Sequence, residues 1–175
     1  MEQGRVFWIT GLSGSGKTTL CSALVEHIRN AGESIIMFDG DVLRYVFGMT
    51  DGYSREERTK VSLRYSRLVH SIVAQGVDVA IATISMYEDV YAWNRENFDR
   101  YVEIYLDVPM DELVRRDPKG IYRRAIAGDL KHVAGMDLVV DRPISPHIHL
   151  EWSPNKTVQT MLSEIVNYLE VNNAE

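Results

Sequence analysis

A glycine-rich motif near the start of the chain constrains the fold more than any other feature. It runs without a gap through Gly11-Leu12-Ser13-Gly14-Ser15-Gly16-Lys17-Thr18 and fits the pattern G-x-x-x-x-G-K-[ST]. Its glycines allow backbone N–H groups to point at phosphate oxygens, and a helix that begins near Lys17 adds the positive end of its dipole. Lys17 is expected to reach the β- and γ-phosphates, and the Thr18 hydroxyl to bind Mg²⁺. The motif therefore predicts binding of a nucleoside triphosphate.

Strand and helix patterns alternate along the whole chain. Residues 5–10 read as a buried strand, and residues 19–28 have apolar side chains at helical spacing. Further strands are expected over residues 34–38, 77–82, 102–108 and 148–151, with helices between them and a loop over 49–53. This order predicts an α/β fold with a parallel sheet and helices on both faces. We interpret residues 1–175 as a single domain, because this length can bury one core.

The composition excludes several classes of function. The net charge of −6 argues against a general nucleic-acid-binding protein. No apolar run approaches the length needed to cross a bilayer, so no membrane partner is expected. Cys21 is the one cysteine, which fits a reducing compartment. The sequence therefore favours a cytoplasmic protein.

Two carboxylates follow the second predicted strand, at Asp39-Gly40-Asp41. Ligands of parallel sheets bind beyond the carboxyl ends of the strands, so these groups are expected beside the phosphate loop. One carboxylate could accept a proton from the hydroxyl of an acceptor, and the other could help to hold Mg²⁺. Alternatively, Asp41 could cap a short helix over residues 42–48.

Basic and aromatic residues accompany these carboxylates. Arg44 and Arg58 flank Tyr53, and guanidinium groups bind phosphate and sulfate oxygens in a bidentate manner. The segment over residues 115–135 is basic and is expected to form a lid that covers the γ-phosphate. A solvated charged helix is the alternative for this lid segment.

Together, these features resemble the adenylyl-sulfate (APS) kinase family. The matching segments are residues 11–19, 39–41 with Arg44, 53–54 with Arg58, 84–85 with Tyr87, and Arg116-Asp117-Pro118-Lys119-Gly120-Ile121-Tyr122. The resemblance covers nearly the whole chain and implies the three-layer fold of P-loop nucleotide kinases. It also implies transfer of the γ-phosphate of ATP to the 3′-hydroxyl of a nucleotide, with Mg²⁺ as cofactor and a homodimer as the assembly.

The resemblance also implies roles for particular residues. Lys17, Asp39 or Asp41, and Ser85 are implied in catalysis, although Ser85 is interpreted first as a substrate contact, and Thr18 and Asp39 are implied as metal ligands. The ATP site is then formed by Gly11, Leu12, Ser13, Gly14, Ser15, Gly16, Lys17, Thr18, Thr19, Arg116 and Lys119. The acceptor site is then formed by Asp41, Arg44, Tyr53, Arg58, Val61, Ser85, Lys119 and Val133.

Two acceptor positions depart from the family pattern. Val133 stands where the family has a second aromatic residue that clamps the base, and Val61 where it has an asparagine. Loss of one stacking partner costs about 1–3 kcal/mol of base affinity. Adenylyl sulfate is the expected acceptor, and cytidine diphosphoramidate is the alternative, because a smaller pyrimidine depends less on two aromatic faces. A catalytically silent, regulatory ATP-binding protein is a further alternative.

Overall fold

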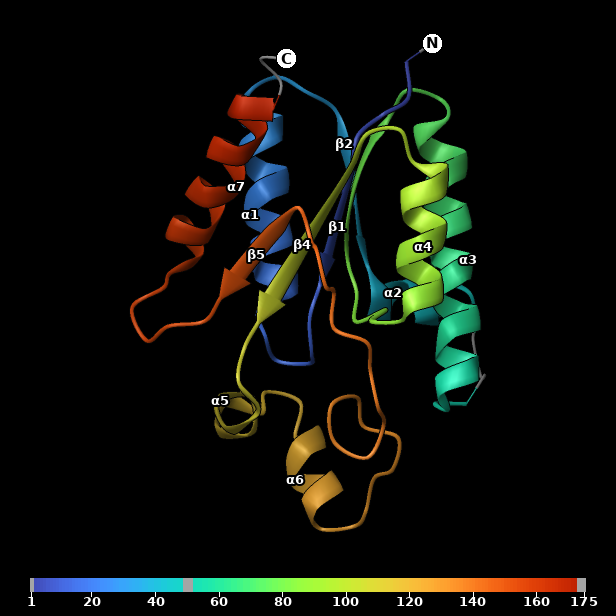
Figure 1. The fold of residues 1–175 in the computed structure, drawn as a ribbon, viewed down its shortest axis with the longest axis vertical. Helices are drawn as coiled ribbons and strands as arrows, with labels where there is room; N and C mark the ends of the chain where they lie inside the picture. Colours follow the sequence, from blue (N-terminus) through green and yellow to red (C-terminus); the bar gives the residue numbers. More distant parts are fainter. Residues whose placement is uncertain (1, 49–51, 173–175) are drawn as a thin grey trace.

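The computed structural model describes residues 2–48 and 52–172, and its centre is a sheet of five parallel strands (Figure 1). The strands are β1 (Val6–Thr10), β2 (Ile35–Asp39), β3 (Asp78–Ala82), β4 (Tyr101–Asp107) and β5 (Ile148–Glu151). Their order in the sheet is β2-β3-β1-β4-β5. Strands β3 and β4 lie on the two sides of β1, and this reversal of strand order opens a ligand crevice at the carboxyl ends of the strands.

Helices cover both faces of this sheet. Helices α1 (Lys17–Asn30) and α7 (Val158–Asn172) lie on one face, and α3 (Arg55–Val73) and α4 (Glu88–Asn97) on the other (Figure 1). This confirms the three-layer α/β fold that the alternation predicted. No described helix is long and apolar enough to cross a membrane.

The first strand shows why the layers form. Phe7 and Ile9 pack against α1 and α7, whereas Val6 and Trp8 point to the opposite face and pack against α3 and α4. All four side chains are fully buried, so the strand is a continuous apolar run instead of an alternating one. Burial of such a side chain stabilises the fold by roughly 1.5–3 kcal/mol.

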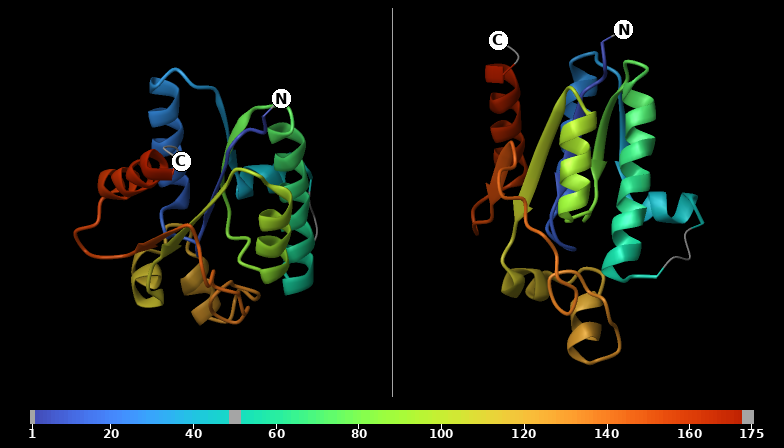
Figure 2. Two further views of the ribbon diagram at one scale, coloured as in Figure 1. Left: turned by 45° about the horizontal axis from the view of Figure 1, so that its top comes forward. Right: turned by 45° about the vertical axis from the view of Figure 1, so that its right-hand side comes forward.

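A third group of elements lies beyond the carboxyl ends of the strands. Helices α5 (Met110–Arg116) and α6 (Ile121–Ile126) pack there around their own apolar cluster (Figures 1 and 2). Helix α6 and the last two residues of α5 belong to residues 115–135, the segment predicted as a lid. In the right-hand view of Figure 2, α2 (Gly40–Val46) projects from the molecule near the lower end of α3.

Helix α2 differs from its prediction. The helix begins at Gly40, two residues before the expected start, and the residue that caps it is Asp39 instead of Asp41. The Asp39 carboxylate accepts the N–H groups of Asp41 and Val42, which would otherwise lack partners in the first turn. Of the loop predicted over residues 49–53, residues 49–51 lie outside the described residues.

Candidate active site

The phosphate loop joins β1 to α1 at the centre of the sheet edge. A Cβ atom on Gly11 would lie 2.7 Å from the Leu106 carbonyl oxygen, so only glycine fits there. The Lys17 Nζ atom donates a hydrogen bond to the Leu12 carbonyl oxygen at 2.7 Å. Loss of water around this amine, together with the nearby charge of Lys119, lowers the pKa of Lys17 to about 8. The loop thus combines a glycine-rich backbone suited to bind phosphate with a lysine amine at its end.

Two acidic side chains lie beside this loop and have different partners. The Asp39 carboxylate accepts a hydrogen bond from the Thr18 Oγ1 at 2.6 Å and also caps α2. The Asp41 carboxylate is exposed and pairs with Lys119 of the lid. Thr18 and Asp39 together offer hard oxygen atoms of the kind that Mg²⁺ prefers, so the donor set fits this metal.

Two arginines gather around Tyr53. The guanidinium carbons of Arg44 and Arg58 lie 4.4 Å and 5.1 Å from the centre of the Tyr53 ring. Arg58 also donates to the carbonyl oxygens of Tyr53 and His132, each at 3.0 Å. Arg58 therefore connects the start of α3 with the loop that follows the lid helices, and burial lowers its pKa.

A row of hydroxyl groups forms another wall. The Ser85 Oγ lies 2.8 Å from the Thr83 Oγ1 and 2.8 Å from the Ser62 Oγ. The Ser62 Oγ in turn lies 2.8 Å from the Arg58 carbonyl oxygen. Ser85 is buried and has a φ angle of 31°, an uncommon value for a residue with a side chain. Backbone strain of this kind is typical of functional sites.

Tyr87 is a polar group at this site to which the sequence analysis assigned no role. Its side chain is only 2% exposed, and its hydroxyl has no hydrogen-bond partner within residues 2–48 and 52–172. Burial raises the pKa of Tyr87, so the hydroxyl stays protonated. The signal available in the sequence was the position of Tyr87, two residues after Ser85.

These groups enclose one cavity of about 490 Å³. Its lining includes the expected residues Lys17, Thr18, Asp39, Asp41, Arg44, Tyr53, Arg58, Val61, Ser85 and Lys119. Val133 is not part of this lining. Its side chain is 4% exposed and packs in the apolar cluster of the lid, with Leu12 and Tyr122. The structure therefore brings residues predicted for the ATP site and residues predicted for the acceptor site to one cavity, whereas Val133 packs outside the lining of that cavity.

A second cavity, of about 300 Å³, lies on the other side of the phosphate loop. Gly16 and Thr19 line it from the loop, and Arg116 lines it from the lid. Its opposite wall consists of Trp152 and residues 156–158, which connect β5 to α7. This wall was not predicted, because nothing local in residues 152–158 indicates that they meet the phosphate loop.

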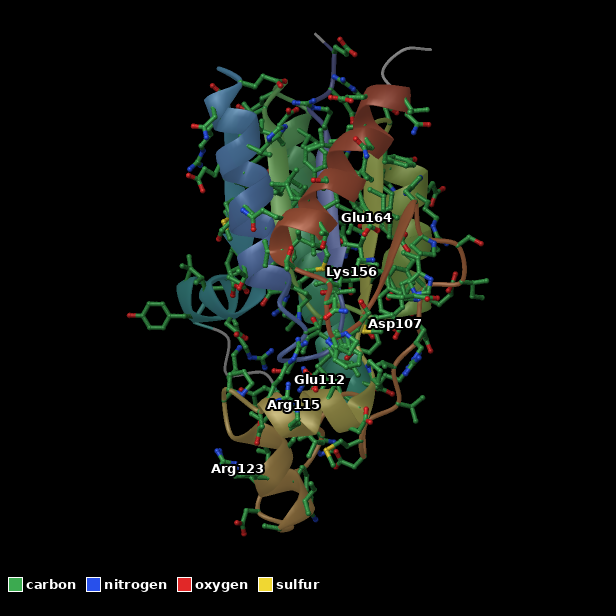
Figure 3. All side chains as sticks on the ribbon, turned by 90° about the vertical axis from the view of Figure 1, so that its left-hand side faces the viewer. Asp107, Glu112, Arg115, Arg123, Lys156 and Glu164 are labelled. Carbon is green, nitrogen blue, oxygen red and sulfur yellow. The ribbon has the colours of Figure 1, made fainter. Side chains whose placement is uncertain are left out.

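The lid is held against the phosphate loop by buried contacts. The Tyr122 hydroxyl donates to the Ser13 carbonyl oxygen at 2.8 Å, and the Asp117 carboxylate accepts the backbone N–H groups of Tyr122 and Arg123. Glu112 accepts hydrogen bonds from both Arg115 and Arg116. Glu112 and Arg115 lie close together below the sheet, with Arg123 farther out on α6 (Figure 3). These contacts position Arg116 at the second cavity.

Comparisons with known proteins identify relatives of this chain. A family profile described as adenylylsulphate kinase matches residues 3–151. A cytidine diphosphoramidate kinase of Campylobacter jejuni is 38% identical over 138 residues, covering 79% of this chain and 81% of that protein. An adenylyl-sulfate kinase of Pseudomonas aeruginosa is 34% identical over 173 residues, covering 98% of this chain and 88% of that protein. The structure of the Mycobacterium tuberculosis APS kinase in complex with AMPPNP and APS has a TM-score of 0.89 and 30% identity, covering 97% of this chain and 99% of that one.

Proposed function

The chain belongs to the adenylylsulphate kinase family, and from this premise we propose that it transfers the γ-phosphate of ATP to the 3′-hydroxyl of a nucleotide. It is a phosphotransferase with an alcohol group as acceptor. The family membership supports adenylyl sulfate as the acceptor. The observation that carries the proposal is the shared cavity, in which the phosphate loop and the Arg44–Tyr53–Arg58 cluster face one space. Dependence on ATP supports a cytoplasmic location.

ATP occupies the phosphate loop in this proposal. Lys17 and the loop amides bind its phosphates, while the second cavity, between Thr19 and Trp152, has the walls to receive its base. Arg116 and Lys119 bring positive charge from the lid over the phosphates. Thr18 and Asp39 would hold Mg²⁺, which when bound neutralises negative charge on the phosphates.

Asp41 is the base in this proposal. Both oxygens of Asp39 are already committed, one to Thr18 and one to the cap of α2, whereas Asp41 pairs with Lys119 at the open cavity. In the transfer, the 3′-hydroxyl gives its proton to the Asp41 carboxylate, and its oxygen bonds to the γ-phosphorus. The bond between this phosphorus and the β–γ bridging oxygen breaks, and that oxygen leaves with ADP.

A second acceptor is favoured by one observation. Val133 does not line the acceptor cavity, whereas Tyr53 lines it and has the guanidinium groups of both Arg44 and Arg58 over its ring. The cytidine diphosphoramidate kinase at 38% identity is consistent with a pyrimidine acceptor in such a site. We therefore retain cytidine diphosphoramidate as the second candidate.

An acceptor panel tests the proposal. Purified protein receives Mg-ATP with adenylyl sulfate, with cytidine diphosphoramidate or with no acceptor, and ADP release is measured. We expect at least one nucleotide to stimulate release, and we expect Asp41→Asn to abolish the stimulation while ATP still binds. Tight ATP binding without stimulation by either nucleotide would contradict the kinase proposal and support a regulatory ATP-binding protein.

A further inference from the structure

The row of hydroxyls in the acceptor cavity has one direction of hydrogen bonding. The Ser62 Oγ lies 2.8 Å from the Arg58 carbonyl oxygen, and a carbonyl oxygen carries no hydrogen, so Ser62 is the donor. With its hydrogen committed, Ser62 can only accept from Ser85, which lies 2.8 Å away. Ser85 in turn can only accept from Thr83. The chain therefore runs from Thr83 through Ser85 and Ser62 to the backbone of α3.

This direction decides what the wall offers to a ligand. A serine or threonine hydroxyl has one hydrogen and two lone pairs, and here all three hydrogens are used within the chain. The three residues line the cavity, and each is less than a tenth exposed. The hydroxyl oxygens therefore have only lone pairs left to offer to a ligand in the cavity. The wall is thus a hydrogen-bond acceptor, in contrast to Arg44, Arg58 and Lys119, which only donate.

From this pattern we propose that the acceptor nucleotide carries N–H donors on its terminal group, as a phosphoramidate does, and that Ser85 accepts from them. The inference rests on the proposed kinase activity and selects between its two acceptors. A sulfate group has only acceptor oxygens, so at Ser85 it would face lone pairs. It could bind there only after Ser85 turned its hydrogen away from Ser62. The arginines hold the phosphate oxygens of either acceptor.

Ser62 is a positioning residue in this scheme, because it acts on the acceptor through Ser85. In Ser62→Ala the hydrogen of Ser85 loses its partner and becomes free to donate into the cavity. The variant is then expected to bind an oxygen at this place as well as an N–H group. Its effect is a change in the preference between acceptors, which loss of folded protein alone would not produce.

The test compares two acceptors that differ in one terminal group, cytidine diphosphoramidate and cytidine 5′-diphosphate. The kcat/KM ratio of the amide to the diphosphate is measured for wild type and variants. Because a ratio is independent of the fraction of active protein, a partly unfolded variant is still informative. We expect the wild type to favour the amide by about fivefold or more, the factor of one hydrogen bond. The diphosphate carries more negative charge, so the cationic side chains alone would favour the opposite order.

We expect the ratio to fall toward one in Ser62→Ala and to recover in Ser62→Thr, which keeps the hydroxyl. Ser66→Ala is the matched control: Ser66 is a buried serine one turn farther along α3, its hydroxyl donates to the Ser62 carbonyl oxygen, and it does not line the cavity. A wild-type preference for the diphosphate, or an unchanged ratio in Ser62→Ala, would overturn this proposal alone. Absence of turnover with these nucleotides and with adenylyl sulfate would overturn the proposed function, and this proposal with it.

Discussion

At the scale of single residues, the contribution of the Lys17 charge to ATP binding can be tested directly. Its pKa is lowered to about 8, so in the free protein the ammonium form is lost as the pH rises through 8. We expect the affinity for ATP to fall by up to about tenfold between pH 7 and pH 9, because the neutral amine no longer attracts the phosphates. Calorimetric titrations with Mg-ATP across this range measure the effect.

Lys17→Arg is the control for this pH dependence, since a guanidinium stays charged throughout the range. Its affinity for ATP should be lower in absolute terms but nearly constant from pH 7 to pH 9. Equal slopes for the wild type and Lys17→Arg would assign the pH dependence to another group.

The second prediction at this scale concerns the effect of the Tyr87 hydroxyl on stability. Because its buried hydroxyl has no partner among the described residues, Tyr87→Phe removes a polar group that costs free energy to bury. We expect the free energy of unfolding to rise by about 1 kcal/mol in urea denaturation. Tyr101→Phe is the control, because the Tyr101 hydroxyl accepts a bond from Asn94, and its loss should destabilise the protein. A decrease in stability for Tyr87→Phe would mean that its hydroxyl is satisfied in solution.

At the scale of elements, a buried hydrogen bond joins the lid to the phosphate loop. Tyr122→Phe removes the hydroxyl that donates to the Ser13 carbonyl oxygen and leaves that oxygen unpaired. The expected cost is about 1 kcal/mol of stability, with a several-fold weaker affinity for ATP because the loop loses its support. Thermal unfolding and ATP titration measure the two effects. Tyr45→Phe should change neither the stability nor the affinity for ATP, since Tyr45 is 86% exposed. Equal effects of the two variants would show that the Tyr122–Ser13 hydrogen bond does not support the phosphate loop.

At the scale of the whole molecule, α2 presents an exposed apolar surface formed by Val42, Tyr45 and Val46. Exposed apolar surface of this kind is typical of an interface, which supports the homodimer that the family resemblance implies. We expect Tyr45→Glu with Val46→Glu to shift sedimentation toward the monomer. The matched control is Ile144→Glu, at a side chain that is 90% exposed and precedes β5, the strand at the opposite edge of the sheet from β2 and α2. A wild-type protein that sediments as a monomer would contradict the homodimer.

Patterns that are local in the sequence identified much of this protein. Side-chain patterns predicted each strand within one or two residues. Strand β1 is a continuous apolar run because it is buried on both faces, whereas β5 alternates between buried and exposed residues. The spacing within residues 11–18 predicted a phosphate loop, since its backbone geometry is determined over a few neighbouring residues. Asp39 was predicted as a site residue because it follows a strand, and Arg44 and Arg58 because they flank Tyr53. All three line the cavity.

Other features depend on contacts between distant residues, and only the tertiary structure decided them. Ser62 and Ser85 are 23 positions apart, and Asp41 and Lys119 are 78 apart, so neither pair was indicated by any local pattern. The placement of β3 between β1 and β2 brings the end of each strand to one cavity. The same packing places Val133 behind the cavity wall. Motifs determine local backbone geometry, whereas the direction of a hydrogen-bond chain and the lining of a cavity depend on how whole layers pack.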